Sequence, residues 1–478
     1  MRTVFLLLSM VGNLRVFLAI KGHGIVYPTL LSARESGEQK TLKINERLTL
    51  NLQRSEVFSD DFVFISEENG ENIHLPMRKY DYEKHLYHDE NLLSSVVVRE
   101  DDGVTVEGIL NEKLSIKPLL EMARTEDGRV PHQLLEIPRL PQTPPHHRDY
   151  NAFNISASNT TFEPHIEERS SQSTIYPELH IVQDSAHAKI FGYKKTAVIV
   201  YFAVFINAVN LRYALNASPR IQLRIRVITM SSKVEEYLVH PGRNQDEILD
   251  EETLAKFNEY YAKRVEFTST DLTFLVTGRD MTFYENGVLQ KWVGGYAYVG
   301  GFCQKHRVGM CEDIPGSYFG VTVFSHEIGH SLGCVHDGSP AESVVPGHRG
   351  SSYCPWDDGF LMSYVRKNRN QYRFSSCCIA DIKNVLSRPE WGCLHKRKKK
   401  SIKRPGLPGV YISGEDFCRN VYPDISGMHY DKRYGVVDCK VHCDYTANYY
   451  IIGVPDGVVC NKKRNKHCVL GECIDKRE

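Results

Sequence analysis

The stretch His326-Glu327-Ile328-Gly329-His330-Ser331-Leu332-Gly333-Cys334-Val335-His336-Asp337 fits the pattern H-E-x-x-H-x-x-G-x-x-H and decides most of what can be said about the chain. On a helix, His326 and His330 are one turn apart and face the same way. Two imidazoles so placed can bind one Zn²⁺, with Glu327 beside a water on the metal. Gly333 can adopt a positive φ that turns the chain and brings His336 back as a third ligand. Three protein ligands leave one position open for water, which is the arrangement of a catalytic zinc site.

The main alternative for this stretch is a buried amphipathic helix whose histidines are satisfied by hydrogen bonds. That alternative leaves Gly333 and His336 as coincidences, and the long motif is far rarer by chance than a bare H-E-x-x-H. The helix is expected over residues 319–332, because its apolar side chains recur at helical spacing. These side chains are Phe319, Val323, Phe324 and Ile328.

The size and composition of the chain fit a globular protein of several domains. Its 478 residues are too many for one core and predict two to four domains. Lys and Arg together number 59, and so do Asp and Glu, so the formal net charge is zero. This balance gives no reason to expect a nucleic-acid partner.

The first 22 residues are typical of a secretory signal peptide, with Arg2 followed by an apolar run that reaches about Ile20. The other long apolar stretch, from Thr196 to Val209, is too short to span a bilayer and contains Asn207. We expect it to form a buried core helix. The protein is therefore expected to be secreted and extracellular, with no membrane span.

The cysteines agree with secretion. All 13 lie between Cys303 and Cys473, which predicts disulfides formed in an oxidising compartment. Because the number is odd, one thiol is free, bonded to another chain or lost with a cleaved piece. Sequons at Asn154, Asn159 and Asn216 predict a glycoprotein.

Local spacing suggests how some of these cysteines are used. Cys303 and Cys311 are expected to close a small loop before the zinc helix. Cys334, inside the motif, is expected to be a structural disulfide partner, because the end of the helix points it away from the metal. The adjacent Cys377 and Cys378 are expected to bond to different partners.

The region from residue 23 to residue 175 has no cysteine and no obvious catalytic cluster. Strand-like runs such as Val96-Val97-Val98 and Leu114-Ser115-Ile116 predict a mostly β region, and its place before a secreted catalytic domain predicts a propeptide. An independent binding domain is the alternative. The Pro-rich segment 138–150 and the polar stretch 151–173 resemble a linker.

Strands and helices interleave over residues 176–395, which predicts an α/β catalytic domain. Strands are expected at 178–182, at 221–228 with alternate residues exposed, at 272–277 and, as an edge strand near the site, at 296–301. Helices are expected at 196–215 and within 246–264.

Two further segments follow the catalytic domain. Residues 396–408 form a basic linker, for which a processing site or a patch for anionic glycans are the alternatives. Residues 409–478 form a small cysteine-rich module whose six cysteines can make three disulfides. A zinc knuckle is the alternative, but the cysteine spacings fit it poorly.

A methionine turn follows the third histidine, in Gly359-Phe360-Leu361-Met362-Ser363-Tyr364. Together with the zinc motif, and with Asp337 directly after His336, it resembles the adamalysin (reprolysin) branch of the metzincin metalloproteases. The run Glu126-Asp127-Gly128-Arg129-Val130-Pro131-His132 resembles the secreted adamalysin-like proteases of tick saliva, and the tail Asp456 to Cys473 resembles the cysteine-rich module of ADAMTS-type proteases.

The resemblance implies a fold, a cofactor and an activity. It implies a twisted mixed sheet with a zinc-binding active-site helix, one catalytic Zn²⁺ on His326, His330 and His336, and a secreted zinc endopeptidase made as a zymogen. A structural Ca²⁺ is left open. Glu327 is expected to take a proton from the water as general base and to deliver it to the leaving amine. By analogy with the family, Met362 packs beneath the metal.

Two departures from the family carry hypotheses. Tyr364 stands where a small residue is usual; one hypothesis is that it donates to the oxyanion, and the other is that it is a packed or surface tyrosine. The N-terminal region has no cysteine to serve as a temporary zinc ligand. Latency then depends on steric cover or on an oxygen or nitrogen ligand, with His132, His146 and His147 as candidates.

The salivary resemblance implies fibrinogen, fibrin or extracellular-matrix proteins as substrates. The alternative function is a catalytically weak protease scaffold that acts as a binding protein through its cysteine-rich tail. The basic linker and the tail could also contact glycans or matrix. An integrin ligand is disfavoured, because the chain carries Gly278-Arg279-Asp280 in place of an RGD tripeptide.

Overall fold

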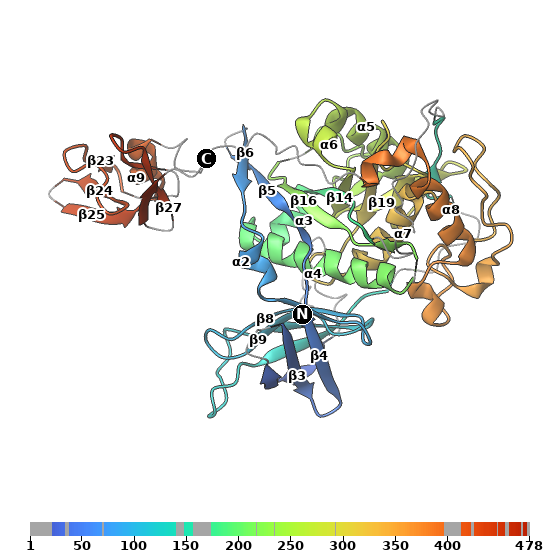
Figure 1. The fold of residues 1–478 in the computed structure, drawn as a ribbon, viewed down its shortest axis with the longest axis horizontal. Helices are drawn as coiled ribbons and strands as arrows, with labels where there is room; N and C mark the ends of the chain where they lie inside the picture. Colours follow the sequence, from blue (N-terminus) through green and yellow to red (C-terminus); the bar gives the residue numbers. More distant parts are fainter. Residues whose placement is uncertain are drawn as a thin grey trace, which may run out of the picture. The chain divides into compact units, whose positions relative to one another are not determined.

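The computed structural model describes residues 22–475 apart from 34–37, 69–70, 140–147, 156–173, 217, 234, 292, 396–412, 422–424, 447, 455–457 and 470–471. The chain divides into two compact units, residues 1–72 with 78–400 and residues 73–77 with 401–478 (Figure 1). The expected basic linker, Asn159, His146, His147 and nearly all of the expected signal peptide lie outside the described residues.

The N-terminal region forms a sheet of its own. Strands β3 and β4 alternate between buried and more exposed side chains, because one face covers a core, whereas β8 is buried at nearly every position. Leu42, Val96 and Ile116 are among the side chains of that core. The nine strands are ordered β1 (Gly22–Val26), β11 (His132–Glu136), β10 (Leu114–Pro118), β9 (Thr105–Ile109), β8 (Ser94–Arg99), β7 (Leu86–Asp89), β4 (Leu48–Arg54), β3 (Gln39–Asn45) and β2 (Thr29–Ala33).

A second, mixed sheet of eight strands carries the zinc motif against one of its ends, as the α/β prediction requires. Most neighbouring strands in this sheet run parallel to each other, and β21 and β22 are antiparallel to each other. The order is β12 (Tyr150–Asn151), β21 (Gly295–Tyr298), β22 (Val308–Glu312), β18 (Leu272–Thr277), β14 (Glu178–Gln183), β16 (Arg224–Met230), β5 (Phe58–Glu68) and β6 (Glu71–Pro76).

Segments from the first 155 residues therefore lie on both sides of the strands that follow residue 176. On one side, β5 pairs in parallel with β16, for example Val63 with Val227. The prediction that 221–228 is half-exposed is wrong, because β16 lies inside the sheet. Even Arg226 is fully buried, where its guanidinium bonds the carboxylates of Glu178 on β14 and Asp61 on β5.

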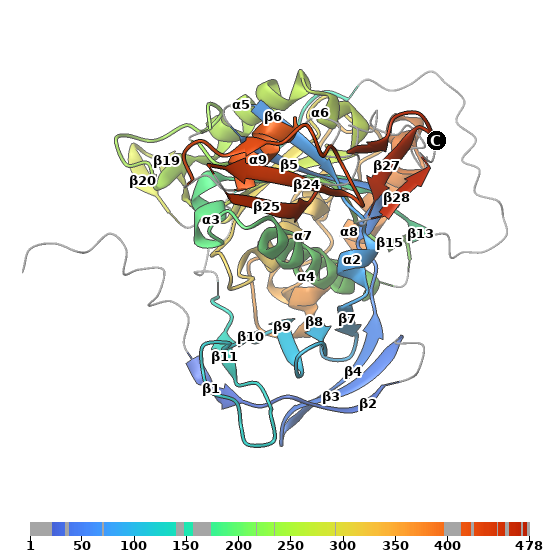
Figure 2. The ribbon, with the colours of Figure 1, turned by 90° about the vertical axis from the view of Figure 1, so that its left-hand side faces the viewer.

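Helix α4 (Lys195–Ala214) lies between the two sheets (Figures 1 and 2). It contacts β7, β8 and β9 of the N-terminal sheet and β16 of the mixed sheet. All its side chains from Val198 to Tyr213 are buried, because both sides of the helix are covered. Among the described residues it is the one helix long and apolar enough to cross a membrane, and its 89% burial fits the predicted core helix.

The remaining elements surround these layers. Helices α5 and α6 lie on the face of the mixed sheet opposite α4 (Figure 1). The bounds are α2 Tyr80–Glu83, β13 Thr174–Ile175, α3 Ser185–Ile190, β15 Arg220–Ile221, β17 Glu247–Leu249, α5 Asp250–Ala262, α6 Val265–Ser269, β19 Asp280–Glu285, β20 Val288–Gln290, α7 Gly320–Ser331 and α8 Ser376–Leu386, with short 3₁₀ helices at Trp356–Asp358, Arg369–Tyr372 and Pro389–His395.

The second unit is small and rich in disulfides. It contains α9 (Gly414–Val421) and two three-stranded sheets, β23 (His429–Tyr430) to β25 (Asn448–Gly453) around β24 (Lys440–Tyr445), and β26 (Val459–Asn461) to β28 (Glu472–Asp475) around β27 (Lys466–Val469). Its cysteines pair as Cys418–Cys443, Cys439–Cys468 and Cys460–Cys473. The predicted three disulfides are confirmed.

The cysteines of the larger unit correct one prediction and confirm two. Cys303 does not pair with Cys311; it bonds Cys393. Cys311 is a free, buried thiol on β22, whose side chain points into the core, and burial raises its pKa. Cys334 is a structural partner, as predicted, and the neighbours Cys377 and Cys378 bond different cysteines: the pairs are Cys334–Cys378 and Cys354–Cys377.

Candidate active site

Helix α7 is held at its start by a buried carboxylate. The backbone N–H of Gly320 donates to Oδ1 of Asp313 at 2.7 Å. A Cβ at position 320 would lie 2.8 Å from Cβ of Asp313, so the close approach requires glycine. Oδ2 of the same carboxylate bonds His187 at 2.8 Å and accepts from Tyr201 at 2.6 Å. The start of the helix is thereby tied to α3 and α4.

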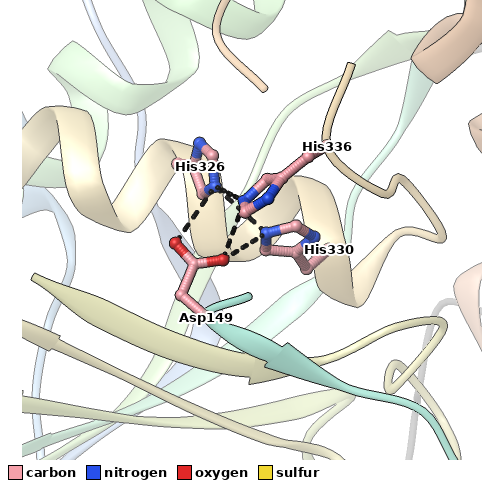
Figure 3. A group of neighbouring side chains, drawn as sticks. All are labelled: Asp149, His326, His330 and His336. Carbon is pink, nitrogen blue, oxygen red and sulfur yellow. Dashed lines mark hydrogen bonds and ion pairs between the residues drawn. The ribbon is translucent and has the colours of Figure 1, made fainter. Parts of the chain in front are cut away.

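The end of α7 turns as the motif predicts. The helix ends at Ser331, within one residue of the predicted bounds at each end, and Gly333 has φ +105°. The chain then returns, and Nε2 of His336 lies 3.2 Å from Nε2 of His326, which lies 3.0 Å from Nε2 of His330. All three rings are buried, and their Nε2 atoms point to a common centre (Figure 3).

Backbone carbonyls fix the orientation of two of these rings. Nδ1 of His326 donates to the carbonyl of Leu361 at 2.7 Å, and Nδ1 of His330 donates to that of Cys334 at 2.8 Å. A proton on Nδ1 leaves the Nε2 lone pair free for a metal. Burial lowers the pKa of His330 to about 4 and also lowers that of His336, which favours the neutral, ligating form.

Glu327 lies one residue after His326 and is buried. Neither of its carboxylate oxygens has a hydrogen-bond partner among the described residues. Burial raises its pKa well above the usual range, and the charges of Asp149 and Asp250 raise it further. Gly295 on β21 makes room for this side chain, because a Cβ there would lie 2.4 Å from Oε1 of Glu327.

A fourth polar group, Asp149, lies among the histidines and is buried (Figure 3). Its Oδ1 is 2.8 Å from Nε2 of His336 and 3.2 Å from that of His330, and its Oδ2 is 3.5 Å from that of His326. Burial opposes ionisation of this carboxyl, but the neighbouring His336 and His326 outweigh it and hold the pKa of Asp149 well below its usual range.

Met362 and Asp337 pack around the helix and loop that carry the three histidines. Met362 is fully buried against α7 at Gly329, where a Cβ would lie 2.7 Å from the sulfur. The N–H of Asp337 donates to the carbonyl of Met362 at 3.0 Å. The carboxylate of Asp337 accepts a hydrogen bond from the hydroxyl of Ser375, the residue that caps α8, at 2.6 Å.

Tyr364 lies against the histidine rings. Its ring stacks on His326 with 5.4 Å between centroids and meets His336 edge-on at 5.3 Å. Trp356 meets the Tyr364 ring edge-on at 5.4 Å and also lies 5.6 Å from the ring of His336. The Tyr364 ring thus packs on two of the three histidines.

His132, a candidate ligand for latency, is not part of this site. It lies on β11 of the N-terminal sheet, where its ring accepts from the N–H of Val106 at 2.9 Å and contacts the carbonyl of Val130 at 2.9 Å. The structure instead brings Asp149 to the histidines, although 181 residues separate it from His330. No local pattern in the sequence marked this aspartate among the many acidic residues.

The residues fit a single metal ion. His326 and His330 each carry Nδ1–H, so their Nε2 atoms are acceptors, and the oxygens of Asp149 are acceptors too. Acceptors that converge at about 3 Å repel one another unless a cation lies between them. Three imidazoles and a carboxylate are a donor set that zinc commonly uses.

Comparison with known proteins points to the same chemistry. Residues 199–337 match the model of the Metallo-peptidase family M12B Reprolysin-like. "A disintegrin and metalloproteinase with thrombospondin motifs like" of Bombyx mori is 29% identical over 327 residues, which cover 65% of this chain and 46% of that protein. This chain thus spans less than half the length of that relative.

Two scorpion proteins match over most of their own length. Venom metalloproteinase BumaMPs1 of Olivierus martensii is 24% identical over 375 residues, 76% of this chain and 90% of that protein. Venom metalloproteinase antarease TserMP_A of Tityus serrulatus is 27% identical over 326 residues, which cover 65% of this chain and 80% of that protein. Among solved structures, metalloproteinase-II from Bacteroides fragilis matches with a TM-score of 0.40 and 12% identity over 76% of this chain and 92% of that one.

Proposed function

The chain belongs to the reprolysin-type metzincins, a family of zinc metalloendopeptidases, and on that premise we propose that His326, His330 and His336 hold one catalytic zinc ion and that Glu327 is the general base. The observation that carries this proposal is the convergence of three Nε2 atoms at 3.0 and 3.2 Å beside a buried glutamate without a partner among the described residues.

Each residue has a defined task. When bound, zinc lowers the pKa of a water toward neutrality and polarises the scissile carbonyl. Glu327, whose raised pKa favours proton uptake, takes the proton of the attacking water and passes it to the leaving amine. Tyr364, beside His326 and His336, donates its hydroxyl proton to the developing oxyanion as a hydrogen bond.

The rest of the chain has supporting roles in this proposal. Residues 1–22 direct secretion, residues 23–175 are a propeptide, and residues 176–395 are the peptidase. The cysteine-rich module, residues 409–478, contributes contacts to glycans or matrix together with the basic residues 396–408. Twelve of the 13 cysteines form disulfides, which supports an extracellular location.

The substrates proposed are extracellular proteins, with fibrinogen, fibrin or matrix proteins as the class to test first. Support comes from the names of relatives: the two scorpion proteins are called venom metalloproteinases, and a protein of Naja kaouthia is called a hemorrhagic metalloproteinase-disintegrin-like protein. The rival function, a weak protease that acts as a binding scaffold, is disfavoured because all three histidines and Glu327 are in place. A protein that only binds partners does not need the three histidines and Glu327 to converge on one point.

The test is hydrolysis of protein substrates by the chain after proteolysis between residues 156 and 173, with both fragments present. We expect cleavage that chelators abolish, that zinc restores, and that Glu327→Ala lowers by about a thousandfold or more. The matched control is Glu252→Ala, an exposed glutamate on α5, which should keep full activity. Cleavage that survives in Glu327→Ala, or a zinc-loaded protein that cleaves nothing, would reject the proposal.

A further inference from the structure

One carboxylate of the N-terminal region, that of Asp149, lies in the candidate metal centre. Asp149 and the three histidines place four ligand atoms within 4.8 Å of one another, and all four residues are buried. Catalysis does not call for this carboxylate, because three histidines already leave the open position that a hydrolytic zinc site needs. A fourth ligand from the protein closes that position.

Backbone hydrogen bonds hold Asp149 in this place. Directly after it, β12 pairs in parallel with β21, with Tyr150 opposite Ala297 and Asn151 opposite Tyr298. The N–H of Ala297 donates to the carbonyl of Asp149 at 3.3 Å, and the N–H of Val299 donates to that of Asn151 at 2.9 Å. The segment thus adds a strand to the edge next to Glu327, a mode by which peptides bind proteins.

Side chains on both sides of the aspartate strengthen this anchor. Arg148 pairs with Glu342 at 2.7 Å, and its guanidinium lies 4.7 Å from the ring centre of Tyr150. That ring packs against His330 at 4.5 Å. On the far side, Asn151 donates to Glu251 at 2.8 Å. The carboxylate is therefore presented by a segment fixed before and after it.

We propose that Asp149 is the fourth zinc ligand of the uncleaved chain and keeps it inactive until the segment 148–155 is displaced. This inference rests on the proposed zinc peptidase function. A carboxylate replaces the water that attacks the substrate, so both nucleophile and substrate are excluded at one position. It also supplies a latency device to an N-terminal region without cysteine, through an oxygen ligand rather than a thiolate.

The test compares the full-length chain with its Asp149→Asn and Asp149→Ala variants. For metal measurements all carry Glu327→Gln, so that none can cut itself. Release of zinc to a dipicolinate chelator should be slow in the parent and about tenfold or more faster in both variants, because one of four ligands is weakened or lost. With Co²⁺ in place of zinc, the visible spectrum of the parent should not change with pH, whereas the variants should gain the titration of a bound water.

Activity provides the second readout, on chains that retain Glu327. Uncut Asp149→Ala should hydrolyse a peptide substrate at least about tenfold faster than the uncut parent, since an open position is restored. Asp102→Asn is the control, because Asp102 is an exposed acid of the same region that pairs with Arg124 at 2.6 Å. It should match the parent in zinc release, in spectrum and in latency.

The outcomes separate the two proposals. Equal zinc release and equal spectra in the parent and both Asp149 variants, together with an active processed enzyme, overturn the Asp149 ligand and leave the peptidase standing. Failure of the processed enzyme to bind one zinc overturns both. A folded Asp149→Asn that keeps the parent's melting temperature shows that its faster zinc release is not unfolding.

Discussion

At the scale of single residues, the tightest fit in the active site is between Gly295 and Glu327. Gly295→Ala places a methyl group 2.4 Å from Oε1 of Glu327, closer than van der Waals contact allows. We expect kcat/KM to fall by about a hundredfold, because a general base shifted by about 1 Å loses its alignment. Zinc content should stay at one per chain. The control is Gly242→Ala, where nothing lies within 4 Å of the added Cβ; equal activities of the two variants would refute the account.

Tyr364 offers a second test at this scale, because its ring and its hydroxyl have separable effects. Tyr364→Phe keeps the stacking on His326 and removes the donor, so kcat should fall by about a hundredfold while zinc affinity is retained. Tyr364→Ala should weaken zinc retention as well. If Tyr364→Phe has the kcat/KM of the parent, Tyr364 is a packing residue only.

Glu235 gives a prediction of pH dependence away from the active site. Burial, and then the charge of Asp184, raises its pKa to about 7. Since this value lies above the ordinary 4.5, the stability contributed by the protonated form is complete below 4.5 and is lost as pH rises through about 7. Glu235→Gln cannot ionise, so its melting temperature should decline less between about pH 5 and about pH 8 than the parent's. Parallel declines would contradict this assignment.

The sequence predicted the three histidines and Glu327 because their spacing is local: one helical turn and one glycine determine where the side chains point. Asp149 could not be found in the same way. Its position depends on β12 pairing with β21, and its partner His330 is 181 residues away. The predicted pairing of Cys303 with Cys311 was wrong for a related reason. Cys311 is close to Cys303 in sequence, but it is a buried thiol on β22.

At the scale of elements, periodicity predicted α4, α7 and β18 within a residue or two, since each has its own hydrophobic pattern. Strand order has no such signature. The alternation within 221–228 predicted a half-exposed strand, and nothing in residues 58–68 indicated that β5 would pair with β16. The partner of a strand is decided by tertiary packing rather than by its own alternation.

The packing of the methionine turn at Met362 against α7 can be tested. Gly329→Ala places a Cβ 2.7 Å from the sulfur of Met362 and 3.0 Å from the ring of Phe374. Overpacking of this kind costs about 1–3 kcal/mol, so the melting temperature should fall. Gly329→Ala should cost less in a Met362→Ala background than in the parent, since the clash is relieved there. An equal cost in the two backgrounds would mean that Met362 is not the side chain that packs against Gly329.

At the scale of the whole molecule, the N-terminal region is part of the fold and not only a cover of the site. It supplies β5 to the mixed sheet and covers α4, where Ser95 donates to the carbonyl of Val204 at 2.9 Å. Residues 174–478 expressed alone expose both the edge of β16 and one side of α4. We expect this shorter chain to be recovered mostly as aggregate.

Supplying residues 22–155 as a separate chain should restore soluble protein, because the missing strand and cover are then available. The same reasoning predicts that proteolysis between residues 156 and 173 leaves the two fragments associated on a sizing column at neutral pH. Full solubility of residues 174–478 alone, or immediate separation of the cut fragments, would contradict this role.

The most direct measurement of the central claim is anomalous diffraction from crystals of the uncleaved, zinc-loaded chain at the zinc absorption edge. The account predicts one peak, at about 2.0–2.2 Å from Nε2 of His326, His330 and His336 and from one carboxylate oxygen of Asp149. A peak bonded to the histidines but not to Asp149 would contradict the proposed latency. Absence of zinc from the three histidines would contradict the proposed active site itself.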